Sequence, residues 1–271
     1  MARSDKSKKI VITIILLVLL MFIFVDLPEA QVDNVLYVGT GQEYLKIQDA
    51  IDNATEGNII YVYNGIYNEN IVIDKSISLV GEDKSSTVID GNNIEDVILV
   101  DISSYQANIT GFTIQNSGNE IYCSGVDIDT DRVIISNNII MGCLIGVEMD
   151  FWCHNCTISD NIFRNNFYGV KVYSVFPNFN LIYHNNFYDN NVSSFDDSNS
   201  TWFFEGEGNH WDDYTGTDND GDGIGDNPYH IPGGAIDKFP LMDPVETPGF
   251  EFLLLLVVFF IFYMLNKAKK K

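Results

Sequence analysis

Four copies of one short phrase decide the fold of this chain: I-T-G-F-T-I at Ile109, I-S-N-N-I-I at Ile135, I-S-D-N-I-F at Ile158 and I-Y-H-N-N-F at Ile182. Their starts are 26, 23 and 24 residues apart. A second phrase recurs with a similar period, as G-V-D-I at Gly125, G-V-E-M at Gly146 and G-V-K-V at Gly169, at intervals of 21 and 23 residues. A repeat of this length indicates a solenoid, either a leucine-rich horseshoe or a parallel β-helix.

The residue types favour the parallel β-helix. Between residues 109 and 191 the chain has only two leucines, Leu144 and Leu181, and is rich in Ile, Val, Phe, Tyr and Asn. β-Branched and aromatic residues are typical of strands, and their alternation turns one side chain in two inward. We expect glycines at 125, 146 and 169 to permit the corners between short strands. The sequence therefore predicts an all-β fold in which each repeat is one rung of a coil.

Residues at equivalent places in successive rungs should lie about 4.8 Å apart. We expect strands over residues 35–190, a rung length within the range of the repeat intervals (21 to 26), and an inward-facing column of Ile135, Ile158 and Ile182. The asparagine three places after each of these isoleucines should form a hydrogen-bonded amide ladder, which comprises Asn138, Asn161 and Asn185. The alternative is that these asparagines only fill turns.

The region from Val35 to Met242 resembles right-handed parallel β-helix proteins with pectin-lyase-like folds, and among them the NosD-like group. The likeness is strongest in the opening phrases G-N-I-I-Y-V-Y-N-G at Gly57 and V-I-D-G at Val88, and in G-N-H-W-D-D-Y at Gly208. It implies a single-stranded right-handed β-helix over residues 31–192 and an irregular C-terminal cap over 193–247. It does not extend to copper delivery, because the four histidines are scattered: His154, His184, His210 and His230.

Both ends of the predicted coil need a cover. An apolar helical stripe at Ile47, Ala50, Ile51 and Ala54 predicts an N-terminal cap helix. Such a helix would protect strand edges from unwanted pairing. At the other end we expect four aromatic residues to cover the core, or alternatively to form a sugar-binding platform: Trp202, Phe203, Phe204 and Trp211.

The two chain ends carry export signals. Residues 1–30 join a basic start to an apolar run, which predicts a signal peptide cleaved after Ala30 or a retained membrane segment. Residues 248–271 begin with Pro248-Gly249-Phe250 and continue into a 14-residue apolar run and a basic tail. This segment resembles the archaeal PGF sorting signal, in which a lipid replaces the tail. Lysines outside both apolar runs place the middle of the chain outside the cell. We therefore expect a cell-surface protein anchored to the cytoplasmic membrane by a terminal segment or a lipid.

The charge balance limits the partners. The full chain has 15 basic and 38 acidic residues and a net charge of −23. Without the two ends 7 basic and 34 acidic residues remain, a net charge of −27 (7 − 34). Such a surface repels nucleic acids, so no nucleic-acid partner is expected, and it attracts cations.

Exported chains usually oxidise their thiols. The four cysteines lie in two neighbouring rungs, which predicts disulfides, with free thiols or a Cys/His metal site as the alternatives: Cys123, Cys143, Cys153 and Cys156. Five N-x-S/T sequons offer glycosylation sites in an exported protein: Asn53, Asn108, Asn155, Asn191 and Asn199.

An acidic loop in the C-terminal cap has the pattern D-x-D-x-D-G-x-x-D. Its aspartates and one carbonyl could surround a calcium ion with oxygen ligands: Asp218, Asp220, Asp222, the Ile224 carbonyl and Asp226. The twelfth position is Tyr229 rather than the glutamate of an EF-hand, so coordination should be weak or completed by water. The alternative is a solvated acidic turn.

The G-V phrases also align charged residues. Asp127, Glu148 and Lys171 each follow a G-V pair and should stack on the outer face, with Asp129 and Asp150 beside them. Two carboxylates about 5 to 9.5 Å apart could hydrolyse a glycosidic bond. We expect Asp127 and Glu148 to be exposed, and the alternative is that they are ordinary surface acids.

These observations favour a surface β-helix that serves as a structural or carbohydrate-recognition scaffold of the envelope. The other candidate is a glycosidase or polysaccharide lyase that acts on extracellular polysaccharide. The repeats offer only three basic residues for lyase chemistry, Arg132, Arg164 and Lys171.

Overall fold

The computed structural model describes residues 34–150, 153–173, 178–198 and 200–246. The two proposed export signals, at 1–30 and 248–271, lie outside the described residues, as does the sequon asparagine Asn199. Among the described residues, no helix combines the length and the apolar character needed to span a membrane.

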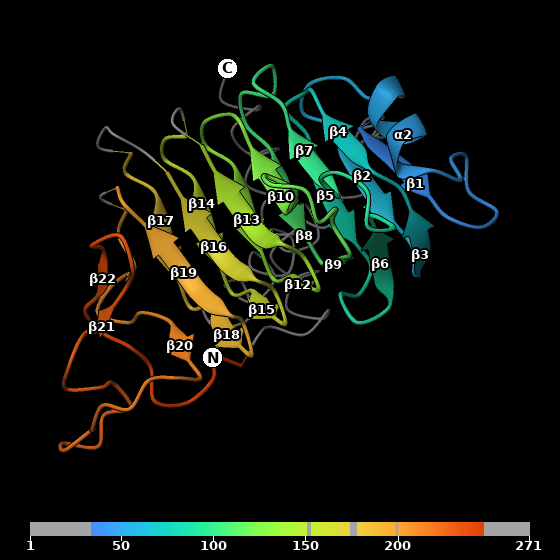
Figure 1. Cartoon of the computed structure of the whole chain (residues 1–271). Helices are drawn as coiled ribbons and strands as arrows, with labels where there is room; N and C mark the ends of the chain where they lie inside the picture. The colour runs from blue at the N-terminus through green and yellow to red at the C-terminus, as the bar shows by residue number, and fades with distance from the viewer. Residues whose placement is uncertain (1–33, 151–152, 174–177, 199, 247–271) are drawn as a thin grey trace, which may run out of the picture. The chain divides into compact units, whose positions relative to one another are not determined.

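The described chain forms a parallel β-helix whose rungs contribute one strand to each of three sheets (Figure 1). Sheet 1 comprises β1 (Val35–Val38), β2 (Ile59–Val62), β5 (Ser78–Gly81), β8 (Asn108–Thr110), β11 (Ile134–Ser136), β14 (Thr157–Ser159) and β17 (Leu181–Tyr183). Sheet 2 comprises β3 (Gly65–Asn68), β6 (Thr87–Asp90), β9 (Thr113–Gln115), β12 (Ile139–Met141), β15 (Ile162–Arg164), β18 (Asn186–Tyr188) and β20 (His210–Trp211). Sheet 3 comprises β4 (Ile71–Ile73), β7 (Ile98–Val100), β10 (Ser124–Ile128), β13 (Ile145–Met149), β16 (Tyr168–Val172) and β19 (Val192–Asp196). The predicted fold class is confirmed.

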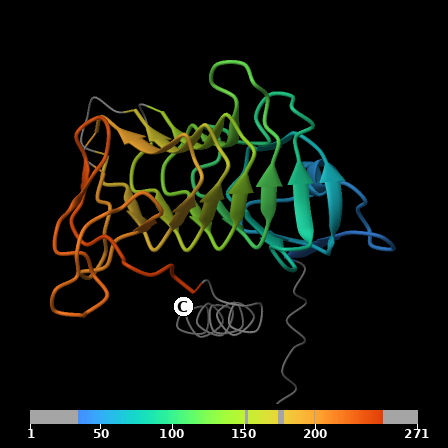
Figure 2. The ribbon, with the colours of Figure 1, turned by 60° about the horizontal axis from the view of Figure 1, so that its bottom comes forward.

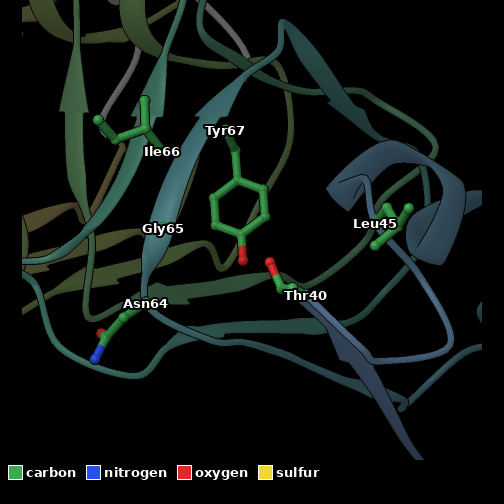
Figure 3. Close-up of a pocket in the computed structure, with 7 residues that line it drawn as sticks. Thr40, Leu45, Asn64, Gly65, Ile66 and Tyr67 are labelled. Atoms are coloured by element: carbon green, nitrogen blue, oxygen red, sulfur yellow. The ribbon is translucent and has the colours of Figure 1, made fainter.

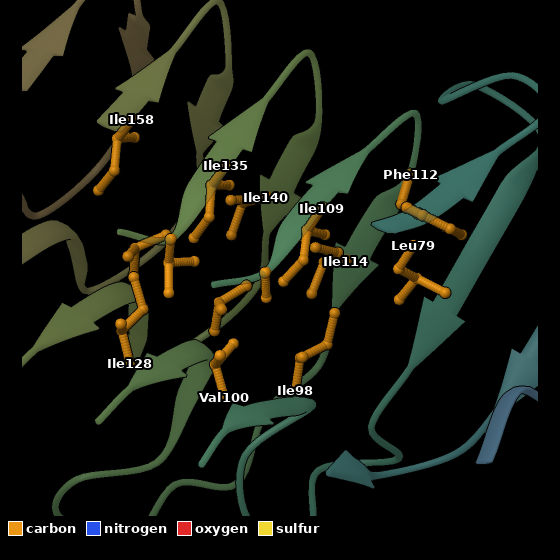
Figure 4. Packing of buried hydrophobic residues seen from close by; sticks show 14 of the residues in the cluster. Leu79, Ile98, Val100, Ile109, Phe112, Ile114, Ile128, Ile135, Ile140 and Ile158 are labelled. Atoms are coloured by element: carbon orange, nitrogen blue, oxygen red, sulfur yellow. The ribbon is translucent and has the colours of Figure 1, made fainter. Parts of the chain in front are cut away.

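The register predicted from the repeats is also confirmed. Ile135 pairs with Ile158, and Ile158 with Ile182, in successive strands of sheet 1. All three side chains are buried. Figure 4 shows Ile109, Ile135 and Ile158 projecting from their strands toward the side chains of the other two sheets.

The predicted rung length holds from Ile109 onward, where the paired isoleucines are the ones that start the repeated phrases. It is wrong for the first rungs. Ile60 pairs with Leu79, which is a shorter interval than predicted, and Leu79 pairs with Ile109, which is a longer one. The loops between the early strands therefore differ in length, although the strands keep their register.

The predicted amide ladder is present. Nδ2 of Asn138 donates to Oδ1 of Asn161 at 3.2 Å, and Nδ2 of Asn161 donates to Oδ1 of Asn185 at 3.1 Å. The ladder continues beyond the predicted members, since Asn185 donates to Asn209 at 3.0 Å and Asn209 donates to Oδ2 of Asp237 at 3.3 Å. All five side chains are buried. The column therefore ends on a buried carboxylate of the C-terminal cap.

The turn before each ladder asparagine has a left-handed backbone. Asn137, Asp160 and His184 have φ values of 56°, 59° and 55°. Asn, Asp and His tolerate this conformation better than most residues. This explains the composition of the phrases I-S-N-N, I-S-D-N and I-Y-H-N, in which the first of the two central residues makes the turn and the second joins the ladder.

The glycines of the G-V phrases have a different role from the one predicted. Gly125, Gly146 and Gly169 lie inside β10, β13 and β16 rather than at corners. A Cβ atom on Gly146 would lie 2.4 Å from the carbonyl oxygen of Gly169, and one on Gly169 would lie 2.3 Å from that of Ser193. These glycines are required because the backbones of neighbouring rungs approach closely there.

Elements at the two ends complete the core. The helix α2 (Ile47–Asn53) lies against β1, β2 and β4 and buries Ile47, Ala50 and Ile51. Figure 2 shows the irregular segment after β20 at the opposite end of the coil. This segment contains a short antiparallel pair, β21 (Tyr229–His230) and β22 (Ile236–Asp237).

The aromatic residues of the C-terminal segment divide into two groups. Trp202 and Trp211 are buried, and the Trp211 ring stacks on Phe187 at 4.4 Å and on Tyr229 at 4.1 Å. Phe203 is only half-buried, and Phe204 is 44% exposed. The expectation that Phe204 covers the core is therefore wrong, because its ring packs against Tyr183 and not against the buried rings of Phe187 and Trp211.

Candidate functional site

Sheet 3 places the three predicted charged residues in one column. Asp127 of β10 pairs with Glu148 of β13, and Glu148 pairs with Lys171 of β16. Their strand neighbours Val126 and Val147 are buried in the core, so alternation turns the charged side chains to the outer face. We call this surface the sheet 3 face. It comprises the outward side chains of β10, β13 and β16 and the aromatic residues beside them.

The expectation that Asp127 and Glu148 are exposed is wrong. Glu148 is 2% exposed, Lys171 is 7% exposed and Asp127 is half-buried. Nζ of Lys171 lies 3.3 Å from Oε1 of Glu148, and Ser124 Oγ donates to Oε2 of Glu148 at 3.2 Å. Burial raises the pKa of Glu148, although Lys171 opposes the shift. Burial lowers the pKa of Lys171, but hydrogen bonding to Tyr173 and attraction to Glu148 outweigh it and leave that pKa above its ordinary value.

Aromatic side chains surround this ion pair. The Lys171 ammonium lies 4.6 Å from the ring centroid of Tyr173, 5.4 Å from that of Tyr168 and 5.9 Å from that of Tyr122. Two phenylalanines extend the group, since Phe167 packs edge-on against Tyr168 and the Phe195 ring packs at a tilt against Tyr173. Tyr122 is 62% exposed and Phe167 is 45% exposed. The face therefore offers aromatic surface to solvent directly beside charged groups.

These aromatic residues were not predicted as part of the site. A signal existed for Tyr173, which follows Lys171 by two residues, but not for Tyr168, which precedes Lys171 by three. Alternation along β16 places residues two apart on the same side of the sheet. Tyr122 gave no such signal, since it precedes β10 in a turn with φ of 79°.

Asp127 has the most perturbed carboxylate of the face. Its Oδ1 atom is buried and has no hydrogen-bond partner among the described residues. Burial raises its pKa to about 8, and the nearby carboxylates of Asp96, Asp129, Glu148 and Asp150 add to the shift. At neutral pH this group is largely protonated and can donate a hydrogen bond.

The acidic loop brings three of the predicted calcium ligands together. One carboxylate oxygen from each of Asp218, Asp220 and Asp222 lies within 4.8 Å of the others. Asp218 is held by the backbone N–H groups of Gly221 and Gly223, at 2.7 and 3.0 Å.

The fourth aspartate of the motif, Asp226, does not belong to this group of three. Its Oδ2 accepts hydrogen bonds from Thr217 Oγ1 at 3.1 Å and from the backbone N–H of Asn219 at 3.0 Å. The backbone N–H of Ile224 donates to Asp222 at 2.9 Å. Asp226 therefore closes the loop by hydrogen bonds, and the three other aspartates supply the clustered oxygens.

The four cysteines are buried free thiols in the structure, where the sequence predicted disulfides. Sγ of Cys153 donates to the carbonyl oxygen of Ile128 at 2.6 Å. Burial raises the pKa of Cys143 to about 11 and that of Cys156 to about 12. Thiols of this kind pack as small apolar groups and react slowly, because the thiolate is the reactive form.

The sequon asparagines differ in accessibility. Asn53, Asn155 and Asn191 are exposed. Asn108 is half-buried in β8, and its Oδ1 atom is buried without a hydrogen-bond partner among the described residues. Asn108 is therefore a poor acceptor for a glycan in the folded protein.

The structure also joins polar residues at the turns between sheets 1 and 2. Nζ of Lys84 donates to Oδ1 of Asn137 at 2.6 Å, and Nε2 of His184 lies 2.7 Å from Glu207. Burial lowers the pKa of Lys84 to about 8, although Asp160 opposes the shift. The first pair links turns two rungs apart and the second links successive rungs, so both help to hold the rungs together.

Comparison with known proteins gives one sequence relative and several structures. No family model matches the chain. A cell surface glycoprotein of Methanothermus fervidus is 36% identical over 118 residues, which covers 38% of this chain and 20% of the relative. The match thus spans about a fifth of the relative's length.

Three solved structures illustrate the structural comparison. Pectin methylesterase from carrot is 14% identical, with a TM-score of 0.41 and coverage of 65% of this chain and 70% of the other. Pectin methylesterase PemA from Erwinia chrysanthemi is 14% identical, with a TM-score of 0.41 and coverage of 69% and 73%. The ORF18 protein of Geobacillus virus E2 is 19% identical, with a TM-score of 0.44 and coverage of 60% and 37%. Similarity at this level does not extend to activity or ligand.

Proposed function

We propose that this protein is a cell-surface β-helix that recognises carbohydrate on the sheet 3 face. The observation that carries the proposal is the group of five aromatic side chains around the Lys171–Glu148 pair, outside the core: Tyr122, Phe167, Tyr168, Tyr173 and Phe195. The location is supported by the surface glycoprotein relative. The export signals expected at both chain ends agree with it.

The chemistry of the face suits a sugar ring. A sugar has apolar C–H faces and polar hydroxyl edges, so it needs flat apolar surface beside groups that accept and donate hydrogen bonds. Tyr122 and Phe167 supply exposed rings, Asp129 and Asp150 supply carboxylates, and protonated Asp127 supplies a donor. The same carboxylates repel anionic sugars. Neutral or amino sugars are therefore the proposed ligand class, and uronates are disfavoured.

A glycan array tests this proposal. The full chain should bind neutral or amino-sugar oligosaccharides more tightly than uronates. Replacing Tyr122 by alanine should weaken binding about tenfold, the equivalent of about 1.4 kcal/mol. The matched control is Tyr105→Ala, because Tyr105 is similarly exposed, at 55%, and also lies against a cation, Arg132 at 4.7 Å. Equal glycan binding by the two variants would show that the glycan does not bind at the sheet 3 face.

A second candidate function is hydrolysis of the bound glycan. The favouring observation is the raised pKa of Asp127, about 8, beside other carboxylates, since glycosidases use a protonated acid next to an ionised one. The same array, scored for products, separates the two functions. An enzyme would release fragments, and Asp127→Asn would abolish cleavage while binding persists. Binding without any product supports recognition alone.

We also propose that the acidic loop binds calcium through Asp218, Asp220 and Asp222. The donor set fits a hard cation, because three carboxylate oxygens lie within 4.8 Å of one another. Repulsion from Asp222 raises the pKa of Asp220, whereas hydrogen bonds, first of all from Gly223, lower that of Asp218. A divalent cation would neutralise this repulsion, and the Ile224 carbonyl, water or Asp226 would complete its coordination.

Millimolar calcium should therefore raise the melting temperature of the full chain. At a free concentration about 100 times Kd, binding stabilises the folded state by about 2.7 kcal/mol. The effect should disappear in Asp220→Ala and Asp222→Ala and persist in Asp243→Ala, which changes an exposed aspartate outside the motif. Sodium at equal ionic strength screens charge without coordination, so equal stabilisation by sodium would identify the segment as a solvated acidic turn.

A further inference from the structure

A parallel β-helix exposes backbone hydrogen-bonding groups at both ends of every sheet. In a parallel pair alternate residues direct their N–H and C=O groups to opposite sides of the strand. The outermost strand of each sheet therefore carries groups that point away from the coil, and such edges invite pairing with other chains.

All three edges at the C-terminal end are covered. The N–H of Ile182 in sheet 1 donates to the carbonyl oxygen of Thr201 at 2.8 Å. The N–H of Asp196 in sheet 3 donates to the carbonyl oxygen of Pro232 at 2.9 Å. In sheet 2, β20 forms a bridge to Leu241.

At the N-terminal end, β1 is covered at Tyr37 and β4 is covered at Val72. The N–H of Tyr44 donates to the carbonyl oxygen of Tyr37 in β1 at 3.3 Å. In β4, the side-chain amide of Gln48 imitates a strand, because its Oε1 accepts from the N–H of Val72 at 2.8 Å and its Nε2 donates to the carbonyl oxygen of Val72 at 3.3 Å.

The third N-terminal edge, β3 of sheet 2, is free within the described part of the chain. The N–H of Gly65 donates to Ser86 at 3.0 Å, on the side of β6. Alternation therefore turns the N–H and C=O of Ile66 to the open side, where no described residue pairs with them. Ile66 is 69% exposed.

A pocket of about 200 Å³ lies against this free edge. It is lined by Asn64, Gly65, Ile66 and Tyr67 of the β3 region and by Gly39, Thr40 and Leu45 of the preceding loop. Figure 3 shows Ile66 and Tyr67 on opposite sides of β3, with the Tyr67 hydroxyl directed toward Thr40. Leu45 is also 69% exposed, so the pocket has an apolar side chain beside the polar groups of Thr40 and Tyr67.

We propose that the free edge of β3 binds an extended peptide segment, of neutral or basic sequence, that pairs with Ile66 and places one apolar side chain in the adjacent pocket. Backbone pairing to a sheet edge with a side-chain pocket beside it is a recurrent mode of peptide recognition. The charge of the chain selects the partner. At a net charge of −23, an acidic peptide or a second copy of this chain would be repelled, whereas a basic segment would be attracted.

This site lies on a different sheet from the sheet 3 face and does not depend on the carbohydrate proposal. β3 has only four residues, so the affinity should be modest. The probe is a fluorescein-labelled, end-capped peptide, Lys-Val-Thr-Val-Lys, titrated with the full chain in detergent and followed by fluorescence anisotropy. We expect saturable binding, together with slower hydrogen exchange over residues 64–68.

Three comparisons test the pairing. A peptide N-methylated at Val, Thr and Val lacks the three central backbone donors and should bind at least tenfold more weakly, as should a peptide with Glu in place of both Lys. Ile66→Pro removes the N–H at an edge position where proline is tolerated, and should weaken binding at least tenfold. Its matched control, Ile66→Thr, keeps the N–H and a β-branched side chain and should retain binding.

The possible results distinguish peptide binding at β3 from self-association of the chain and from the absence of binding. Absence of binding, or equal binding of the N-methylated peptide, would overturn it. Self-association of the chain through residues 64–68 that the peptide does not displace would assign the edge to a second copy instead. If Ile66→Pro fails to fold by circular dichroism, the N-methylated peptide on the unchanged chain still decides.

Discussion

Replacing Asp237 by alanine is expected to lower the free energy of unfolding by about 4 kcal/mol, because it leaves several buried donors without an acceptor. Asp237 is fully buried. Its Oδ2 accepts hydrogen bonds from the N–H of Asn209 at 2.8 Å and from Trp211 Nε1 at 3.0 Å, and its Oδ1 accepts from the N–H of Phe239 at 3.0 Å. Loss of this carboxylate also removes the acceptor for the last amide of the ladder.

Chemical denaturation followed by tryptophan fluorescence measures this effect, since Trp202 and Trp211 lie at the same end of the coil. Asp237→Asn retains one acceptor oxygen and should cost less than alanine. Asp243→Ala changes an exposed aspartate and should lie within about 0.5 kcal/mol of the unchanged chain. A cost below about 1 kcal/mol for Asp237→Ala would show that the ladder does not depend on its terminal carboxylate.

Replacing Asp127 by asparagine is expected to stabilise the protein, and the gain should grow with pH. The folded state holds the pKa of Asp127 at about 8, against an ordinary value of 3.8. Below pH 3.8 the carboxyl is protonated in both states and has no effect on stability. Between that pH and about 8 the unfolded chain ionises and the folded chain does not, so the wild-type protein loses stability as pH rises.

The full shift corresponds to about 5 to 6 kcal/mol, and partial solvent exposure of Asp127 reduces the expected gain to about 2 to 3 kcal/mol at pH 8. Denaturation curves of both proteins between pH 4 and pH 8 provide the measurement. Asp243→Asn, outside the face, is the control for a general effect of net charge. Parallel stability curves for the Asp127 variant and the unchanged chain would contradict the burial described here. A stabilising change that impairs glycan binding or cleavage would mark Asp127 as a residue retained for function.

The repeating phrases predicted most of the fold because equivalent residues pack in the same way in every rung. Ile135, Ile158 and Ile182 occupy equivalent places, and the asparagines after them meet at the spacing of paired strands. The order of Asp127, Glu148 and Lys171 followed from the same periodicity. Period and residue type were sufficient for these features.

Features that depend on contacts between distant or non-repeating segments could not be predicted. The ladder ends on Asp237, which lies outside the repeats. Burial of Glu148 depends on Lys171 and on aromatic neighbours such as Tyr122, which comes from a turn. The charge of Glu148 suggested that its side chain would be exposed. The ion pair with Lys171 instead allows that side chain to be buried. The free edge of β3 could not be predicted from the sequence either, because only the structure shows that Gln48 covers the edge of β4.

Hydroxyl-radical footprinting of the full chain, with and without the tightest-binding glycan of the array, would locate the surface to which the glycan binds. Tyr122 is 62% exposed on the sheet 3 face, and Tyr105 is 55% exposed in the loop between β7 and β8, so both should be oxidised readily in the free protein. If the sheet 3 face binds the glycan, bound glycan protects Tyr122 and Phe167 from oxidation and leaves the oxidation of Tyr105 unchanged. Unchanged oxidation of Tyr122 under saturating glycan, with protection elsewhere on the coil, would contradict binding at this face.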